Sequence, residues 1–156
     1  MSSERSGASV EQLYRELAGD DEVVAEPTDS EYRSAEVVSE VLGRLFPEES
    51  FAFDEEQVKL SLDEILLVLV ALRESETHGK GLMDDLAALF DAQLSPGTVY
   101  PRLHELEEDD ILEMHELVRT KEYRLDDPDA ARARVESAMQ QHLALGFIFY
   151  SALQEF

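Results

Sequence analysis

Three basic side chains lie close together in the last third of the chain. Arg119, Lys121 and Arg124 fall within six residues, and this is the densest basic cluster in the sequence. Apolar and polar residues alternate on both sides of it, which predicts an antiparallel hairpin with these cations near the tip. There they can bind phosphate, or they can pair with Glu116 and Glu122 across the hairpin. Residue spacing leaves both interpretations open.

A second group of residues is suited to holding an anion at the start of a helix. A serine fits the cap position and the proline after it fits the first helical position. A glycine and a threonine follow. Taken alone, these four residues indicate a plain helix start; within the longer motif described below, they leave the free backbone N–H groups of the first turn accessible to a phosphate. A tyrosine and an arginine come next and can reach phosphates or base edges, where an arginine–guanine pair contributes about 1–3 kcal/mol of discrimination. These residues are Ser95, Pro96, Gly97, Thr98, Tyr100 and Arg102.

Other kinds of chemistry find little support. Cysteine is absent, which excludes disulfides and thiolate-bound metals. The histidines, His78, His104, His115 and His142, show no metal-ligand spacing. Glycine-rich phosphate loops, nucleophile elbows and dinucleotide fingerprints are also missing. We therefore expect no catalytic residue, no metal ligand and no cofactor, and we predict that the protein is not an enzyme.

The charge is extreme. The chain has 36 acidic residues against 13 lysines and arginines, a net charge of −23. A hydrophobic fraction of 44% with seven Phe and five Tyr argues against general disorder. This composition is typical of a folded protein from a high-salt cytoplasm, where a Debye length of about 3 Å at molar salt screens self-repulsion. The sequence also lacks a signal peptide and a long apolar run, so we expect a cytoplasmic protein without membrane contact.

The chain divides into four predicted segments. Residues 1–27 read as a flexible acidic tail with a short helix over 9–18. Residues 28–60 form an N-terminal helical extension, in which a helix from Thr28 to Phe46 is ended by Pro47 and residues 51–60 are either extended or a helix start. Residues 61–127 hold three helices and the hairpin, and residues 128–156 form one long helix.

The central segment begins with a capping box, Ser61 with Glu64, and an apolar core helix over 62–73. Helices starting near Gly79 and Pro96 follow, and His78 is expected at a helix start. The hairpin spans 111–125. This order predicts a mainly α protein with a small β-hairpin wing (α+β), a winged helix-turn-helix that carries a long C-terminal dimerisation helix and an N-terminal helical extension.

The last segment is nearly neutral, with three acids and two bases in residues 128–156. Surfaces that avoid charge in so acidic a chain are usually covered. Either a second subunit covers this helix, or it packs inside the chain against the 28–46 helix. We favour the subunit interface, through Leu143, Phe147, Phe149, Tyr150, Leu153 and Phe156.

The segment LSPGTVYPRLHELEEDDIL, residues 94–112, resembles the PadR family of transcriptional regulators, whose recognition helix typically reads LSPGTLYPALxRLEEEGLL. The resemblance extends to EILLVLVAL, to THGKGLMDDLAALF, where the family has HGYEL, and to EYRLDD, where it has YYRLT. It covers about residues 61–127, and the C-terminal helix by position. Lys80 replaces the family tyrosine, Asp109 and Asp110 stand where the family has glycine, and the wing is short.

The resemblance implies a DNA-binding transcriptional regulator, in the first instance a repressor. A homodimer would present two recognition helices about 34 Å apart to a palindromic operator on double-stranded DNA. Residues 1–60 match nothing in the family and are a candidate surface for a protein partner. The alternative is an adaptor that keeps the winged helix but signals through protein contacts, for example in cell-shape or stress control.

The far end of the recognition helix, Glu105 to Asp110, is acidic. Counterion release drives DNA binding in dilute salt, but that gain is small at molar salt. We expect cations to be taken up between these carboxylates and the phosphates, so that DNA affinity falls weakly or even rises with added KCl.

Overall fold

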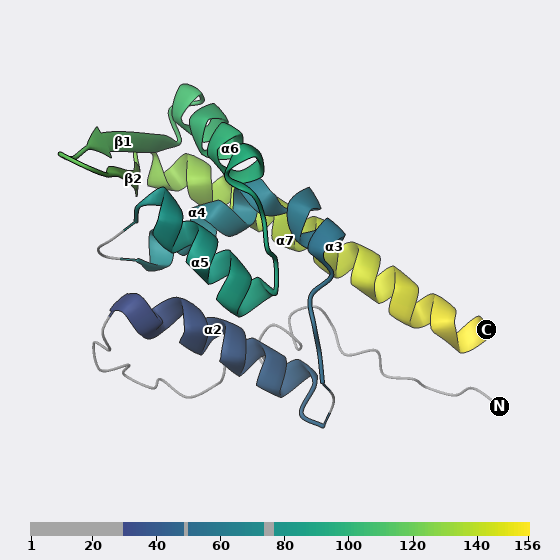
Figure 1. Cartoon of the computed structure of the whole chain (residues 1–156). Helices are drawn as coiled ribbons and strands as arrows, with labels where there is room; N and C mark the ends of the chain where they lie inside the picture. Colours follow the sequence, from purple (N-terminus) through teal and green to yellow (C-terminus); the bar gives the residue numbers. More distant parts are fainter. Residues whose placement is uncertain (1–29, 49, 74–76) are drawn as a thin grey trace.

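The structure, a computed structural model, describes residues 30–48, 50–73 and 77–156 (Figure 1). The tail and short helix expected within residues 1–27 lie outside the described residues. The described chain is mostly helical with one two-stranded antiparallel sheet. The elements are α2 (Ser30–Leu45), α3 (Glu55–Leu60), α4 (Leu62–Leu72), α5 (Gly79–Phe90), α6 (Pro96–Glu108), β1 (Leu112–Glu116), β2 (Lys121–Leu125), α7 (Pro128–Ala152) and the 3₁₀ turn η1 (Leu153–Glu155).

The core is built around α4. This helix is apolar around most of its circumference, and α2, α5, α6, α7 and β2 all pack against it. Its leucines Leu66, Leu67 and Leu69 are at most 1% exposed. The facing helices contribute Leu86 and Leu103, both fully buried. The helices and hairpin predicted for residues 61–127 are therefore confirmed, and they form a winged helix.

Side chains cap several of the helices. Asp54 accepts from the backbone of Glu56 and Gln57 at the start of α3, and Asp127 accepts from Ala130 at the start of α7. Residues 51–54 lie outside any helix or strand and α3 follows from Glu55, so the helix start predicted as one alternative for 51–60 is confirmed.

The predicted capping box at Ser61 is wrong. Ser61 precedes α4, but its hydroxyl makes no cap hydrogen bond. Because α3 runs almost directly into α4, Ser61 has φ −110° and ψ 20° and serves as the last cap of α3 as well. Its Oγ lies 2.9 Å from Nε2 of His142 and so links α4 to α7.

The hairpin is attached to the start of α5. Leu112 pairs with Leu125 and Glu116 with Lys121, and the backbone N–H of Leu117 donates to the carbonyl of Thr120 in the tip. The backbone N–H of Tyr123 donates to the carbonyl of Thr77 at 3.1 Å, and the Thr77 hydroxyl donates to the carbonyl of Tyr123. The residues before α5 thus form an isolated antiparallel bridge with β2, between His78 and Glu122, which ties the wing to α5.

The N-terminal extension packs on the domain. Helix α2 ends at Leu45, ahead of Pro47 as predicted, and contacts α4 and α5. A chain of aromatic contacts then joins the end of α2 to the end of α5. Its members are Phe46, Phe51, Phe53 and Phe90, with successive ring centroids 4.5–5.0 Å apart.

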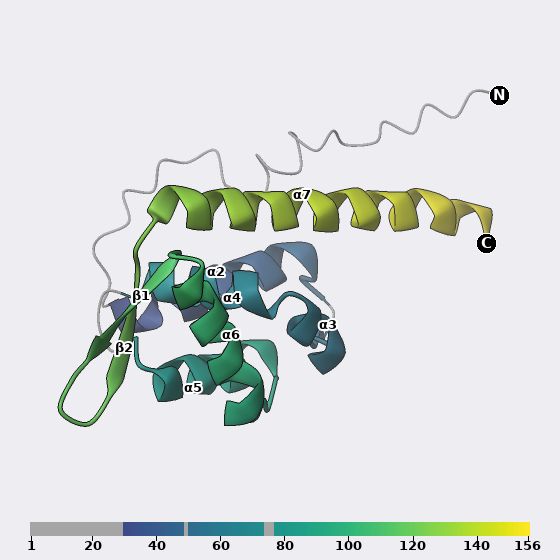
Figure 2. The same cartoon turned by 90° about the horizontal axis from the view of Figure 1, so that it is seen from above.

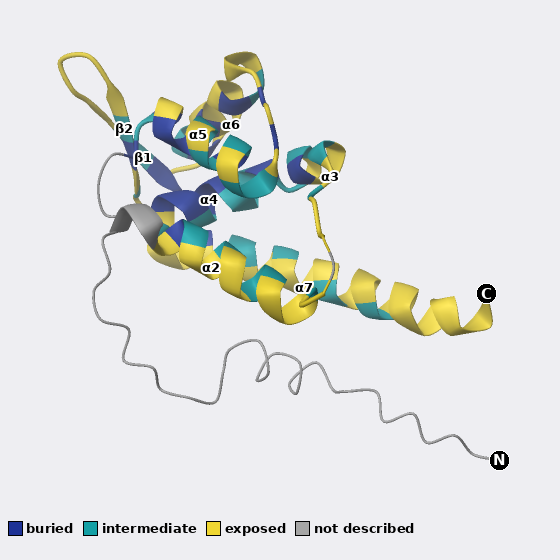
Figure 3. Ribbon diagram, turned by 60° about the horizontal axis from the view of Figure 1, so that its bottom comes forward, coloured by how far each residue is buried: buried dark blue, intermediate teal, exposed yellow. Residues whose placement is uncertain are grey.

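Helix α7 passes along α4, and its C-terminal end projects beyond the rest of the domain (Figure 2). Ala131, in its second turn, is the one residue of α7 that is fully buried. The projecting end is largely exposed (Figure 3), with Phe149 at 62%, Tyr150 at 66% and Leu153 at 65%. Helix α2 does not cover these side chains, so the alternative of an intrachain core is wrong for them. None of the described helices has the length and apolar character needed to cross a membrane.

Candidate nucleic-acid interface

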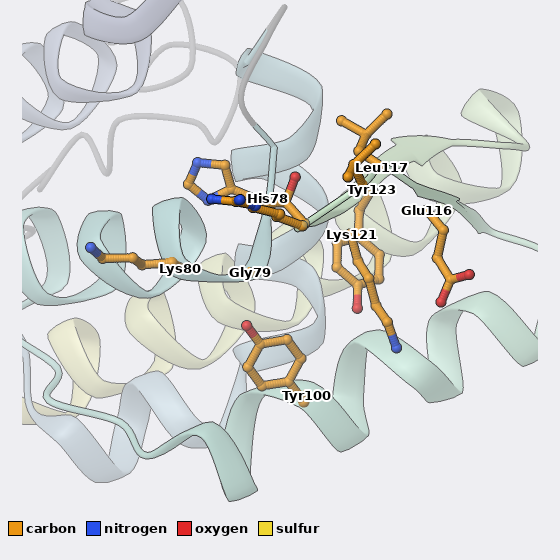
Figure 4. A pocket seen from close by; sticks show the side chains of 11 residues that line it. His78, Gly79, Lys80, Tyr100, Glu116, Leu117, Lys121 and Tyr123 are labelled. Atoms are coloured by element: carbon orange, nitrogen blue, oxygen red, sulfur yellow. The ribbon is translucent and has the colours of Figure 1, made fainter.

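A hollow of about 810 Å³ lies where the hairpin, the start of α5 and α6 meet (Figure 4). We call it the wing hollow. It is open to solvent and bounded by two phenol rings and the aliphatic tip of the hairpin. Its lining consists of residues 78–80, Tyr100, residues 116–121 and Tyr123. It therefore brings Arg119 and Lys121 of the predicted basic cluster next to α6, the predicted recognition helix.

The wing hollow is cationic although the chain is strongly anionic. Lys80, Arg119 and Lys121 line it, and Glu116 is the one carboxylate in its lining. Within the described part of the chain, none of these three cations makes a salt bridge. Unpaired cations around an open hollow provide the charge that a phosphate needs.

The two interpretations of the wing cations apply to different residues. Nη2 of Arg124 lies 3.6 Å from Oε2 of Glu122, so Arg124 is paired within the hairpin. Arg119 and Lys121 lie at the tip, where no described carboxylate pairs with them. Of the three wing cations, Arg119 and Lys121 are thus the two without a described carboxylate partner.

The predicted anion-binding start of α6 is exposed. Ser95 caps the helix and Pro96 is its first residue, as predicted. The Ser95 hydroxyl makes no bond to the helix backbone and lies 3.1 Å from the hydroxyl of Thr98. Ser95, Pro96 and Gly97 are all exposed, so the first turn is accessible from solvent.

Tyr100 and Arg102 leave α6 on different sides. Tyr100 lines the wing hollow and is 39% exposed. Arg102 instead faces α4, with its Nη1 3.5 Å from Oδ1 of Asp63 and 4.0 Å from Oε2 of Glu105. The structure therefore brings Tyr100 together with the wing cations but keeps Arg102 apart from them.

Asp63 is a residue that the sequence analysis missed. Its side chain is only 14% exposed, and its Oδ2 accepts a 2.9 Å hydrogen bond from Nη2 of Arg134 in α7. One carboxylate thus contacts an arginine of the recognition helix and an arginine of the long C-terminal helix. Residue spacing carries no signal for it, because the three residues belong to three different elements.

The far end of α6 places a histidine beside two carboxylates. His104 lies 3.2 Å from Glu108 and 3.9 Å from Glu107. The helix then ends in a Schellman motif, since Ile111 donates to the carbonyl of Leu106 and the residue before it is left-handed at φ 57°. That residue is Asp110, at the position where the PadR-like pattern has glycine.

Four further residues, which the sequence analysis did not assign to the site, line the wing hollow. His78 caps α5, as expected for a helix start, with Nδ1 accepting from the backbone N–H of Gly81 at 2.9 Å. Gly79 and Lys80 follow it into the wing hollow. Burial, together with the charges of Tyr100 and Glu107, raises the pKa of Tyr123 above its ordinary value. The sequence signals for this set were the expected helix start at His78 and the replacement of the family tyrosine by Lys80.

No group of three or more His, Asp or Glu side chains suited to a metal ion occurs among residues 30–48, 50–73 and 77–156.

Comparison with known proteins gives a consistent set of relatives. A profile of the transcriptional regulator PadR-like family matches residues 68–131. The transcriptional activator GvpE1 of Halobacterium salinarum is 40% identical over 94 residues, which are 60% of this chain and 49% of that protein. The transcriptional activator GvpE of Haloferax mediterranei is 40% identical over 95 residues, which are 61% and 49% of the two chains. This chain thus spans about half the length of the curated relatives it matches.

A solved structure of a PadR-like transcription factor from Bacteroides fragilis also matches, with 18% identity and a TM-score of 0.48. The match covers 62% of this chain and 93% of that one.

Proposed function

We propose that this protein, whose residues 68–131 match the profile of the PadR-like family of transcriptional regulators, binds double-stranded DNA as a homodimer and regulates transcription in a high-salt cytoplasm. The wing hollow and the start of α6 are the proposed DNA-binding surface. The curated relatives come from two haloarchaea, which supports a high-salt setting.

The observation that carries this proposal is the charge of the wing hollow. In a chain with a net charge of −23, three unpaired cations line one hollow beside the recognition helix. Recognition of DNA depends on phosphate contacts to position the protein and on base contacts to specify the sequence. Arg119, Lys121 and Lys80 supply the positioning contacts, and the start of α6 enters the major groove.

The proposed dimer interface is the projecting end of α7. Its large apolar side chains are exposed in the single chain, and Phe156 is fully exposed. Exposed contiguous apolar surface of this kind marks a protein interface. Pairing through α7 also provides the two-fold symmetry that a palindromic operator requires.

The sign of regulation is a separate proposal. The sequence analysis predicts a repressor, whereas the matched relatives are named activators. A winged helix positions the protein on DNA in either case, and the location of the operator relative to the promoter decides the outcome. We keep regulation of either sign within the proposal, with transcript levels in a deletion strain as its measure.

Crosslinking of the protein to the genome of its native host, followed by sequencing, tests the DNA-binding surface. We expect discrete peaks that disappear in an Arg119→Ala/Lys121→Ala variant. Lys59→Ala is the matched control because it removes one cation from α3, outside the wing hollow. Peaks retained in the double variant would refute the assigned surface, and absence of peaks for the unmodified protein would refute DNA binding.

Sedimentation in molar KCl tests the dimer. Phe149→Glu places a charge on the proposed interface and should yield monomers. Ala88→Glu adds the same charge to an exposed site on α5 and should leave the dimer intact. A Phe149→Glu variant that sediments as a dimer would exclude this interface.

A second candidate is the adaptor. Arg102 is paired with Asp63 and His104 lies beside Glu107 and Glu108, so the middle and far end of α6 offer no unpaired cation. Helix α2 adds an extension that the family match does not include. On this reading, crosslinking gives no peaks, and affinity capture of the native protein returns a stoichiometric protein partner that a chain lacking residues 1–48 fails to hold.

A further inference from the structure

Gly79 lies against the ring of Tyr100. A Cβ atom built on Gly79 would lie 2.4 Å from the Tyr100 hydroxyl oxygen and 2.6 Å from ring atoms Cε1 and Cζ. Such distances are far inside van der Waals contact. A side chain at residue 79 would therefore displace the tyrosine ring from its present position.

The backbone conformation at Gly79 does not require a glycine. The described residues with left-handed backbone other than glycine are Asp91 and Asp110, and Gly79 itself is the first residue of α5 with no positive φ. Alanine is a better helix former than glycine by up to about 1 kcal/mol. Without Tyr100, alanine at position 79 would be tolerated or would stabilise α5.

The contact also lies where three elements meet. The residues just before Gly79 pair with β2, so the start of α5 is fixed to the hairpin. Tyr100 comes from α6, and Figure 4 shows its hydroxyl directed toward Gly79 at the wall of the wing hollow. The position of this ring therefore depends on the bare backbone of Gly79.

We propose that Gly79 is a positioning residue for DNA binding: its missing side chain lets the Tyr100 ring lie against the start of α5, which keeps the wing hollow open and presents the tyrosine hydroxyl to a backbone phosphate. This inference rests on the proposed DNA-binding function. The residue that touches DNA is Tyr100, and Gly79 acts through it.

An alanine at position 79 has a predictable structural effect. Tyr100 is 39% exposed, so its ring can rotate outward to avoid the new methyl group. The rotated ring then enters the wing hollow between α6 and the cations of the hairpin. The fold is retained, but the ring obstructs the part of the wing hollow where we propose that the phosphate binds, and the tyrosine hydroxyl is displaced.

The test measures DNA affinity by fluorescence anisotropy, with full-length dimer and a labelled duplex recovered by genomic crosslinking. Gly79→Ala should weaken binding at least about tenfold, as expected for loss of one hydrogen bond to a charged group. Tyr100→Phe, which keeps the ring but removes the hydroxyl, should weaken it as well. Gly43→Ala is the matched control, because a Cβ at that glycine of α2 meets no atom within 4 Å.

The double variant separates positioning from a general structural role. In a Tyr100→Ala background, Gly79→Ala should cause no further loss of affinity, since the methyl group then meets no ring. Thermal unfolding should show the same coupling: Gly79→Ala raises the melting temperature in the Tyr100→Ala background but not in the unmodified protein. These measurements remain decisive if Gly79→Ala alone folds poorly, because the double variant has room for the methyl group.

Two results overturn the inference. Equal DNA affinity of Gly79→Ala and the unmodified protein would show that the contact is irrelevant to binding, and additive losses in the double variant would show that Gly79 does not act through Tyr100. Failure of the unmodified protein to bind any recovered duplex is a different result, which removes the proposed function together with this inference.

Discussion

Asp63 contacts both the recognition helix and the long C-terminal helix, and Asp63→Asn tests what that contact does. The substitution keeps the size of the side chain but removes its charge. The 2.9 Å hydrogen bond from Arg134 loses its charge assistance, because at most a neutral amide oxygen accepts it, and Arg102 loses an anionic partner at 3.5 Å. Hydrogen bonds to charged groups contribute about 1.5–3 kcal/mol in buried settings, and exposed ion pairs about 0–1 kcal/mol.

The solvent exposure of Arg102 and Arg134 determines how much stability Asp63→Asn should cost. The side chains of Arg102 and Arg134 are 46% and 35% exposed, so both contributions are discounted for solvent screening. We expect the free energy of unfolding to fall by about 1–2 kcal/mol, which lowers the melting temperature by roughly 2–8 °C in a domain of this size. The released Arg102 can then reach DNA, so affinity should rise about two- to fivefold.

Thermal unfolding followed by circular dichroism and DNA binding followed by anisotropy, both in molar KCl, measure these effects. Asp84→Asn is the matched control because it removes one exposed carboxylate from α5 and changes the net charge equally. Equal melting temperatures for the two variants would refute the structural role of Asp63. Weaker DNA binding by Asp63→Asn would refute the release of Arg102 and would mean that Asp63 holds this arginine in its DNA-binding position.

Three further predictions concern the stability of the domain. Asp110→Gly should raise the free energy of unfolding by about 0.5–1 kcal/mol in chemical denaturation, since φ is 57° at this helix end; a destabilised variant would contradict the Schellman assignment. Leu66→Ala should lower it by about 2–5 kcal/mol because the side chain is fully buried, and a loss below that of an exposed alanine variant would place Leu66 outside the core. Tyr123 has a raised pKa, so its contribution to stability is complete below the unfolded pKa of about 10 and is lost as pH rises through the folded value. Tyr123→Phe should therefore lose less stability between pH 9 and about pH 11 than the unmodified protein, and parallel pH curves would contradict the burial of the phenol.

Local sequence signals located most of the secondary structure. The Ser95-Pro96 pair marked the start of α6, Pro47 marked the end of α2, and alternation located the hairpin. These signals are reliable because caps, proline and strand alternation act between residues close in the chain. The capping box at Ser61 failed because α3 runs into α4, so the serine hydroxyl turned to His142 in a distant helix.

Identifying the candidate site required both the residue types in the sequence and the side-chain contacts in the structure. The basic cluster of the hairpin and the exposed start of α6 could be read from residue types alone, and Tyr100 of α6 lines the same hollow as Arg119 and Lys121. The assignment of Arg102 to the same surface could not be checked from spacing, because the direction of a helical side chain depends on what packs beside it. Asp63 holds that arginine on the other side of α6.

The sequence by itself determined the order of the elements, the extreme acidity and the family resemblance, because composition, local capping and motif spacing are written along the chain. Only the tertiary structure decided that Lys80 joins Arg119 and Lys121, that Arg102 turns toward Asp63, and that Gly79 makes room for Tyr100. Those outcomes depend on which side chains meet across elements far apart in sequence. The packing of the core around α4 fixes these contacts, and the spacing of residues along the chain does not predict that packing.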